Sequence, residues 1–291
     1  MNRLPRPNFF DDHFALQSLS QNRSVNSYPE LQPHVAAVLG GYQQYVAVAG
    51  DATKVEPVPL PAQIKKHLLA HYKSPNVDLQ HIRELRIRSE VNTCPMCGSL
   101  HSGTLDHLLP KTDFPEFAIF GLNLVPACKC NGLRSRNLTG PNLGERILHP
   151  YFDDFLGERL IAVRFTELGP VPHLSLRVLL DAPDPRLPSV SFHIANVVER
   201  TGVLQFMSRT WAKLIRRPGQ LTTDLSGNPA SRDDLKEILQ KELTRLDDFH
   251  ESKNNWLSMF VFGLLDDDVL DWLYDRFSRP GRQPDDPLLI T

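Results

Sequence analysis

All four cysteines of this 291-residue chain fall within one polar stretch, from Cys94 to Cys130. They form two close pairs, Cys94-x-x-Cys97 and Cys128-x-Cys130. The first pair has the usual spacing of a zinc knuckle, in which one turn directs two thiolates at the same tetrahedral ion. The second pair is one residue shorter than the common form, so its turn must be tighter. We therefore predict a structural zinc ion, held by four thiolates, that stabilises a segment with too few apolar residues to fold alone.

Two other interpretations of the cysteines stay open. Cysteine is often a buried apolar residue without a ligand role, and paired cysteines can form disulfides. Clustering at both ends of one polar segment disfavours four unrelated buried thiols. The N-terminal sequence MNRLPRPNFF lacks the apolar stretch of a secretory signal, which argues against disulfides and predicts a cytoplasmic protein. No apolar run approaches the length of a membrane span, so we expect no membrane partner.

Polar residues of a second kind lie around the cysteine pairs. Asp106 and His107 are adjacent between the pairs, Asn123 precedes the second pair, and Asn131 follows it directly. Carboxylate and amide oxygens are hard ligands that suit Mg²⁺ or Mn²⁺. A neutral imidazole can take a proton from water near neutral pH. A single histidine is more often an ordinary packed residue, but this combination predicts a one-metal site that hydrolyses phosphodiester bonds.

The segment resembles an HNH endonuclease, the His-Me finger or ββα-metal type with zinc-binding cysteine pairs. The resemblance covers about residues 94–137 and consists of C-x-x-C, then D-H-x-x-P-K, then N-L-V-P-x-C, and then C-N. It implies that His107 is the general base and that Asp106 and Asn131 are ligands of a catalytic Mg²⁺ or Mn²⁺. It also implies that Asn123 braces the loop that carries His107.

A narrower resemblance concerns residues 106–128, DHLLPKTDFPEFAIFGLNLVPAC. They are similar to HNH proteins of bacterial anti-phage systems, including the Septu type, which work with an ATPase partner. This resemblance implies a defence effector that cuts DNA and is controlled by such an ATPase. The large helical flanks suit docking onto a partner or a second copy, although their apolar residues equally suit an ordinary core.

Basic residues gather near the motif even though the net charge of the whole chain is −2. A protein that binds DNA without specificity is usually basic overall, so the basic surface must be local here. We predict that Lys111, Arg134 and Arg136 hold phosphates that flank the cleavage site. The alternative is that these side chains only keep the surface soluble.

Two other functions stay open. A zinc module that binds nucleic acid or protein without catalysis would explain the cysteines, but it gives no reason for Asp106, His107 and Asn131. An RNA-cutting HNH nuclease would use the same residues, because recognition of the ribose 2′-hydroxyl has no short sequence signature.

The chain as a whole predicts an α+β fold that is mostly helical, with a central ββα-metal finger and a small β-hairpin. The hairpin is expected from the apolar runs 160–165 and 174–180, which flank Gly169-Pro170. A long helix is expected over 191–216, with Gly202 as its candidate break. We expect an N-terminal helical region, the finger, a C-terminal region with the hairpin and further helices, and a flexible Pro-rich tail: residues 1–90, 91–145, 146–279 and 280–291.

Overall fold

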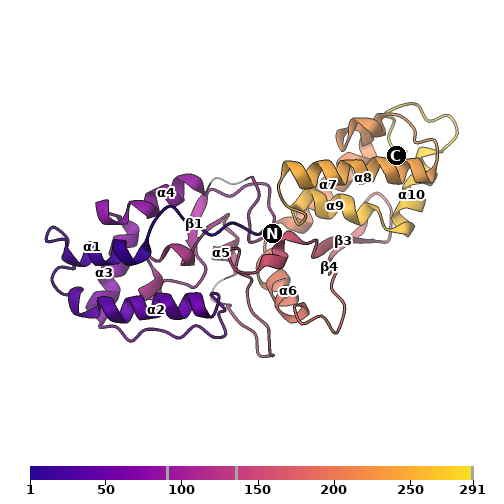
Figure 1. Ribbon diagram of the computed structural model, residues 1–291. Coiled ribbons are helices and arrows are strands. Elements are labelled where there is room, and N and C mark those ends of the chain that lie inside the picture. The colour runs from indigo at the N-terminus through magenta and orange to yellow at the C-terminus, as the bar shows by residue number, and fades with distance from the viewer. Residues whose placement is uncertain (90–91, 135–136, 290–291) are drawn as a thin grey trace.

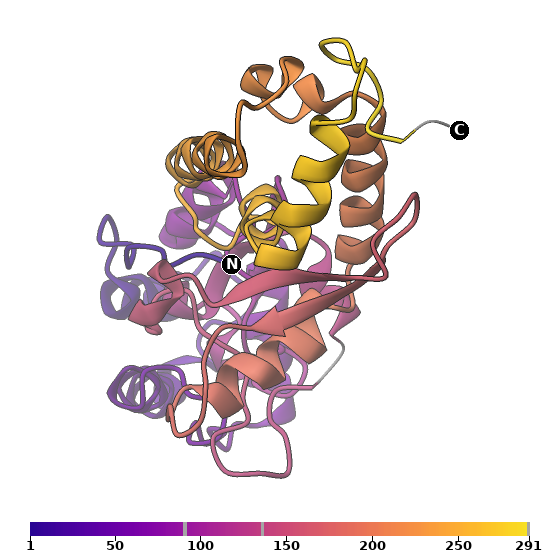
Figure 2. The same cartoon turned by 90° about the vertical axis from the view of Figure 1, so that its right-hand side faces the viewer.

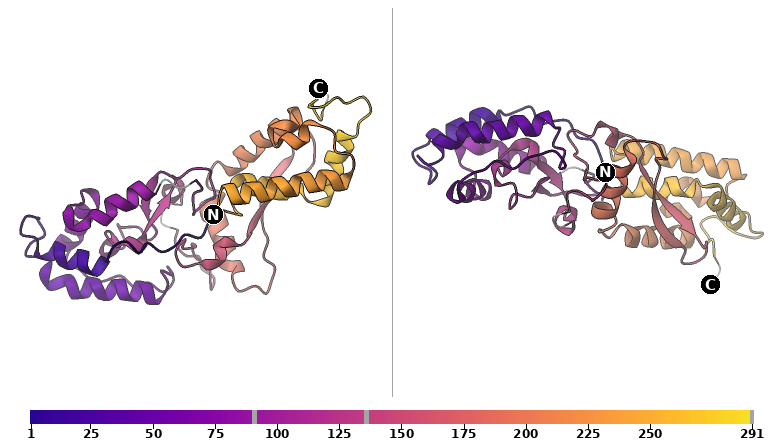
Figure 3. Two further views of the ribbon diagram at one scale, coloured as in Figure 1. Left: turned by 45° about the horizontal axis from the view of Figure 1, so that its top comes forward. Right: turned by 90° about the horizontal axis from the view of Figure 1, so that it is seen from below.

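The computed structural model describes residues 1–89, 92–134 and 137–289. Within them the fold is α+β, with many helices and two small antiparallel sheets of two strands each, as the sequence predicts. The molecule is elongated and has two lobes, with α1 to α4 in one and α7 to α10 in the other (Figure 1). Strand β1 and helix α5 lie between the lobes, and the two views of Figure 3 show the same arrangement.

The N-terminal lobe is built from four helices around one apolar core. The first begins where Asp11 Oδ1 accepts hydrogen bonds from the N–H groups of His13 and Phe14, which caps the helix. The second begins just after Pro33, which lies in a preceding 3₁₀ turn and is disfavoured inside an α-helix. The bounds are α1 Asp12–Gln21, α2 Val35–Ala47, α3 Ala62–Lys73 and α4 Gln80–Arg88.

The predicted ββα segment is present between the lobes. Strand β1, Thr104–His107, pairs antiparallel with β2, Leu124–Ala127, and His107 lies opposite Leu124. Helix α5, Cys130–Leu133, follows β2 after one short turn. The first strand ends at His107 rather than at Pro110, and beyond it the Leu108 N–H donates to the carbonyl of Asn123.

The two strands of the finger contribute to two different cores. Leu105 and Leu124 pack with the N-terminal helices. Val125 and Ala127 pack with the C-terminal lobe, and so do all four cysteines. The finger therefore has no separate core, and its predicted boundaries at residues 91 and 145 stay a prediction.

The C-terminal lobe contains the predicted hairpin, β3 Ile161–Thr166 paired antiparallel with β4 His173–Val178. Figure 2 shows the hairpin crossing between α6 and the helices α9 and α10. Helix α9 lies very close to β3, because a Cβ added at Gly263 would be 2.3 Å from the carbonyl oxygen of Val163. The helices are α6 Leu187–His193, α7 Val203–Arg216, α8 Arg232–Phe249, α9 Trp256–Leu264 and α10 Asp267–Phe277.

The structure divides the helix expected over 191–216 at its candidate break. A turn at residues 199–202 includes Gly202 and precedes α7, whereas α6 starts earlier than expected, at Leu187, and continues as a π-helical segment Ile194–Val198. The tail expected to be flexible is packed as far as residue 289. Leu288 is 0% exposed, and its N–H donates to the carbonyl of Ile215 at 2.7 Å. Burial of this leucine offsets the entropy lost by ordering the tail.

Most helices of this lobe are short compared with a membrane-spanning helix. The most apolar of them, α9, has only nine residues. Across the described ranges of the chain, no helix is both long enough and apolar enough to cross a membrane.

Two histidines are buried and must stay neutral. His149 Nδ1 accepts from the Tyr151 N–H at 3.2 Å, and His193 Nδ1 accepts from the Leu148 N–H at 3.0 Å. A protonated nitrogen could not accept these bonds. Burial is the main cause that lowers the pKa of each histidine to about 3.

We therefore expect the protein to lose stability as the pH falls below about 6.5. There the unfolded chain binds protons that the folded chain does not, and each histidine can lower the unfolding free energy by about 1.4 kcal/mol per pH unit. Urea unfolding of the wild type and of His193→Gln between pH 7.5 and 5 measures the effect. The difference in slope isolates His193 from Asp12, whose pKa burial raises to about 7 and whose contribution has the opposite sign. Equal slopes for the two proteins would contradict the assignment.

Candidate metal centre and catalytic cavity

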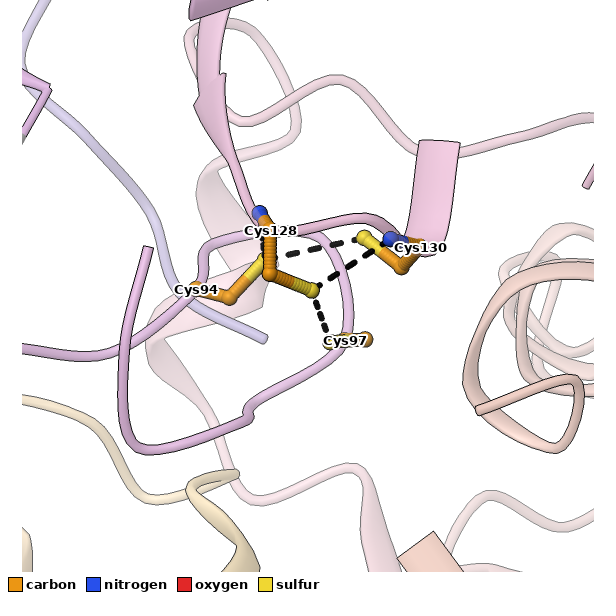
Figure 4. A group of neighbouring side chains, drawn as sticks. All are labelled: Cys94, Cys97, Cys128 and Cys130. Atoms are coloured by element: carbon orange, nitrogen blue, oxygen red, sulfur yellow. Dashed lines mark hydrogen bonds between the residues drawn. The ribbon is translucent and has the colours of Figure 1, made fainter. Parts of the chain in front are cut away.

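The four cysteine sulfurs form one cluster, in which every sulfur lies within 4.8 Å of the others. Cys94 Sγ is 3.7 Å from Cys130 Sγ, and Cys97 Sγ is 3.4 Å from Cys128 Sγ (Figure 4). Four thiolates around a tetrahedral zinc ion, each at about 2.3 Å, are about 3.8 Å apart. The residues therefore fit the predicted zinc site.

The short link between Cys128 and Cys130 does not prevent this arrangement. Lys129 adopts helical backbone angles, φ −69° and ψ −2°, and Cys130 is the first residue of α5. This tight turn brings both sulfurs to the same side. The Cys128 N–H also points to Cys94 Sγ and the Cys130 N–H to Cys128 Sγ, both at 3.4 Å. Such N–H groups stabilise the negative charge of thiolate ligands.

The C-terminal lobe holds the first cysteine pair in place. The Trp256 indole N–H donates to the carbonyl of Cys97 at 2.8 Å. His193 Nε2 bonds to the carbonyl of Met96 at 2.6 Å, and the Asn2 N–H donates to the carbonyl of Pro95 at 3.0 Å. The cysteine cluster is thus part of the packing of this lobe.

Five of the predicted catalytic and phosphate-binding residues line one cavity of about 200 Å³ beside the cysteine cluster. Pro110, Thr112 and Gly132 complete its wall. Asn123 lies behind the cavity, and Arg136 lies outside the described residues. The five residues are Asp106, His107, Lys111, Asn131 and Arg134.

His107 is held in one tautomer. The side chain is 3% exposed, and its Nε2 lies 2.9 Å from the carbonyl oxygen of Ala118. A carbonyl can only accept, so Nε2 carries the hydrogen and Nδ1 keeps its lone pair. The pKa of His107 is lowered to about 4. Burial is the main cause, and the hydrogen bond to the Ala118 carbonyl opposes it in part. The imidazole is therefore neutral at pH 7 and able to accept a proton.

Asn123 holds the loop that follows His107. It is 0% exposed, and its side chain makes hydrogen bonds at both ends. Oδ1 accepts from the Leu109 N–H at 2.8 Å, and Nδ2 donates to the carbonyls of Leu109 at 3.1 Å and Phe117 at 3.2 Å. The Tyr45 hydroxyl also donates to Oδ1 at 3.2 Å. These hydrogen bonds fix the backbone of the loop after His107 against neighbouring elements.

Asn131 is placed so that its amide oxygen could be a metal ligand. Its Nδ2 lies 3.4 Å from the carbonyl oxygen of His107, while its Oδ1 accepts from Arg134 Nε at 3.1 Å. An amide oxygen has a second lone pair, which leaves it one position for an ion. Asp106 supplies the carboxylate of the cavity, and its Oδ1 accepts from the His107 N–H at 2.8 Å. These hard oxygen donors fit Mg²⁺ or Mn²⁺.

Arg134 differs from the exposed phosphate ligand that was expected. It is 2% exposed, and its guanidinium is largely occupied by the protein. Nη2 donates to the carbonyls of His107 and Leu108, which fixes the end of β1. Within the described residues, Nη1 is buried without a hydrogen-bond partner. Burial lowers the pKa of Arg134 to about 10, partly offset by Asp106, so the side chain keeps its charge at neutral pH.

Tyr72 is a residue of this site that sequence reasoning missed. It lies on α3, and its ring centroid is 4.2 Å from that of His107. The sequence shows Tyr72 only as one of several apolar positions on a helix, and no motif connects it with the finger.

Comparisons with known proteins give limited information on this site. No protein-family model matches the chain, and no solved structure matches it. The chain is 24% identical over 168 residues to "Protein ea31" of Escherichia phage lambda, which covers 56% of this chain and 52% of that protein. The chain thus spans about half the length of this relative, whose name states no activity.

Proposed function

We propose that this chain is a metal-dependent endonuclease of the HNH type that hydrolyses phosphodiester bonds of DNA. One observation supports this most strongly. Asp106, His107 and Asn131 line the same cavity, next to four cysteines at zinc-binding distances. A zinc module that only binds a partner would not need a buried neutral imidazole beside a carboxylate.

The geometry supports a defined role for each group. His107 Nδ1 takes a proton from the attacking water, while the Ala118 carbonyl keeps the ring in the required tautomer. A divalent ion bound by Asp106 and Asn131 would stabilise the charge on the phosphate and on the leaving oxygen. Lys111 lies on the cavity wall, where its ammonium can hold a flanking phosphate. Arg134 fixes the strand end from which Asp106 and His107 project.

Supercoiled plasmid incubated with Mg²⁺ or Mn²⁺ tests the proposal, beside a single-stranded RNA and a sample treated with EDTA. Since EDTA can also remove zinc, Mg²⁺ alone is added back to the dialysed sample. Cleavage of the plasmid that returns with Mg²⁺ supports the proposal. Cleavage of RNA alone would move the substrate class to RNA. Failure to cut either substrate with any divalent ion would reject catalysis in favour of a binding module.

The two asparagines are expected to act differently. Asn131→Ala removes a ligand oxygen, so activity should need a higher Mg²⁺ concentration, and Asn131→Asp should restore part of it. Asn123→Ala leaves the N–H and the carbonyl of Leu109 unpaired, and each buried unpaired group costs about 1–3 kcal/mol.

Asn123→Ala should therefore lower the unfolding free energy and the rate, with little change in the metal requirement. A Mg²⁺ titration of initial rates for the two alanine variants, read together with urea unfolding, separates the roles. Equal shifts in the Mg²⁺ midpoint would show that the roles are divided wrongly.

The biological setting is also a proposal. The resemblance of residues 106–128 to HNH proteins of anti-phage systems supports a defence effector that acts with an ATPase. The similar lambda protein connects the chain with phages but favours neither host nor phage as its user. Phage plating on cells that express the chain with a candidate ATPase, beside the His107→Ala form, tests this setting. Equal plating on both strains would reject the defence role.

A further inference from the structure

Tyr72 contacts both the imidazole of His107 and the strand that carries it. The two rings meet at an angle of 65°, with their centroids 4.2 Å apart. The Tyr72 hydroxyl donates to the carbonyl of Leu105 at 2.8 Å. Leu105 is in β1, two positions before His107, so one side chain limits both the tilt of the ring and the movement of its strand.

The same tyrosine ring holds two cations. The guanidinium carbon of Arg86 lies 4.9 Å from the ring centroid, and Lys111 Nζ lies 4.6 Å from it. Arg86 Nη2 also donates to the Tyr72 carbonyl at 2.7 Å, which fixes the guanidinium at the end of α3. Among residues 1–89, 92–134 and 137–289, neither cation has a carboxylate within ion-pair distance. Two cations beside the base, one of them held by a backbone carbonyl and neither in an ion pair within the described chain, suit an anionic ligand.

We propose that Tyr72 is a positioning residue that joins His107 to phosphate binding, and that Arg86 together with Lys111 receives a backbone phosphate next to the scissile bond. This inference rests on the proposed nuclease function. A phosphate bound by Arg86 and Lys111 lies beside the Tyr72 ring, which also contacts the His107 imidazole. The Tyr72 side chain therefore aligns both the substrate and the base. Tyr72 itself touches no reacting atom.

The positioning role of Tyr72 has one readout, the tautomer of His107, that needs neither substrate nor catalytic metal. Full-length protein with ¹⁵N-labelled histidine is compared by NMR as wild type, Tyr72→Phe and Tyr72→Leu. The wild type should show His107 as the Nε2–H tautomer, protected by the Ala118 carbonyl. Tyr72→Phe keeps the ring and should keep this signature, whereas Tyr72→Leu should lose it and lower kcat about 10-fold to 100-fold. An unchanged His107 signature in Tyr72→Leu would overturn the positioning role.

The phosphate half has a matched control on the same helix. Arg83 and Arg86 both lie on α4 and both donate to a backbone carbonyl, but only Arg86 lies against the Tyr72 ring. Arg86→Gln should weaken binding of a DNA duplex and reduce the slope of log affinity against log salt by about one. Arg83→Gln should leave both unchanged.

The outcomes separate this inference from the nuclease proposal. Equal losses of affinity in Arg83→Gln and Arg86→Gln would overturn the phosphate site while leaving nuclease activity in place. A wild type that neither binds nor cuts nucleic acid would overturn the phosphate site together with the proposed function. The NMR comparison still decides the role of Tyr72 in that case, because it needs no substrate.

Discussion

His107→Ala should abolish DNA cleavage while the protein stays folded and keeps its zinc. Loss of a general base lowers a rate by about 10²–10⁴-fold, which takes a plasmid-nicking assay to its background. The structural reason is that the ring is fixed at Nε2 by the Ala118 carbonyl and keeps Nδ1 available, and alanine supplies no nitrogen there. His107→Gln is a useful second variant, because its amide can still donate to this carbonyl but cannot act as the base.

The matched control is His101→Ala. His101 belongs to the same finger but is exposed, so its loss should change neither activity nor stability. Circular dichroism and zinc content establish that each variant is folded. A clean preparation of folded His107→Gln with wild-type activity would falsify the assignment of the base.

Removal of one zinc ligand should have the largest effect on the fold. Zinc should copurify at about one ion per chain, as expected for a single four-thiolate site. Structural zinc sites contribute about 10–16 kcal/mol of apparent binding free energy, which is comparable to the net stability of a whole domain. Cys94→Ser and Cys97→Ser should therefore yield an insoluble or protease-sensitive chain, because the finger has no core of its own.

Lys129→Ala provides the comparison for these variants. Lys129 is exposed and lies between two of the cysteines, so its replacement changes the same turn without removing a ligand. Elemental analysis, thermal unfolding and limited proteolysis compare the proteins. Soluble, folded wild-type protein without zinc would rule out the metal site, and a stable Cys97→Ser variant with full zinc would remove Cys97 from the ligand set.

Local sequence patterns were sufficient for much of the fold. The apolar runs 160–165 and 174–180 located β3 and β4 within two residues, because strand and turn signals act over a few neighbouring positions. The motif residues identified the cavity for a similar reason, since Asp106 and His107 are adjacent and Asn131 follows a cysteine. Gly202 indicated the break in the helix expected over 191–216, because glycine is unfavourable inside a helix, but no local signal placed the start of α6 as early as Leu187.

The features that could not be predicted from the sequence depend on contacts between residues that are far apart in the chain. The Ala118 carbonyl that fixes His107, and the Tyr72 ring beside it, depend on how distant elements pack. Arg134 looks like an exposed phosphate ligand in the sequence, but the fold buries it against backbone carbonyls. The order of the tail depends on Leu288 meeting a core formed by earlier helices. None of these contacts has a local signature.

The division of β1 and β2 between two cores limits how this protein could be regulated or engineered. Leu124 and Val125 are neighbours in the chain but anchor opposite lobes. A change in the angle between the lobes would therefore strain β2 and its partner β1, which carries the proposed catalytic residues Asp106 and His107. A partner protein that binds both lobes could in this way alter the proposed activity without contacting the cavity. For the same reason, a fragment of residues 91–145 should be unstable, because it lacks the packing contacts that both lobes supply. A compound that binds between the lobes and separates them should inhibit the protein without entering the cavity.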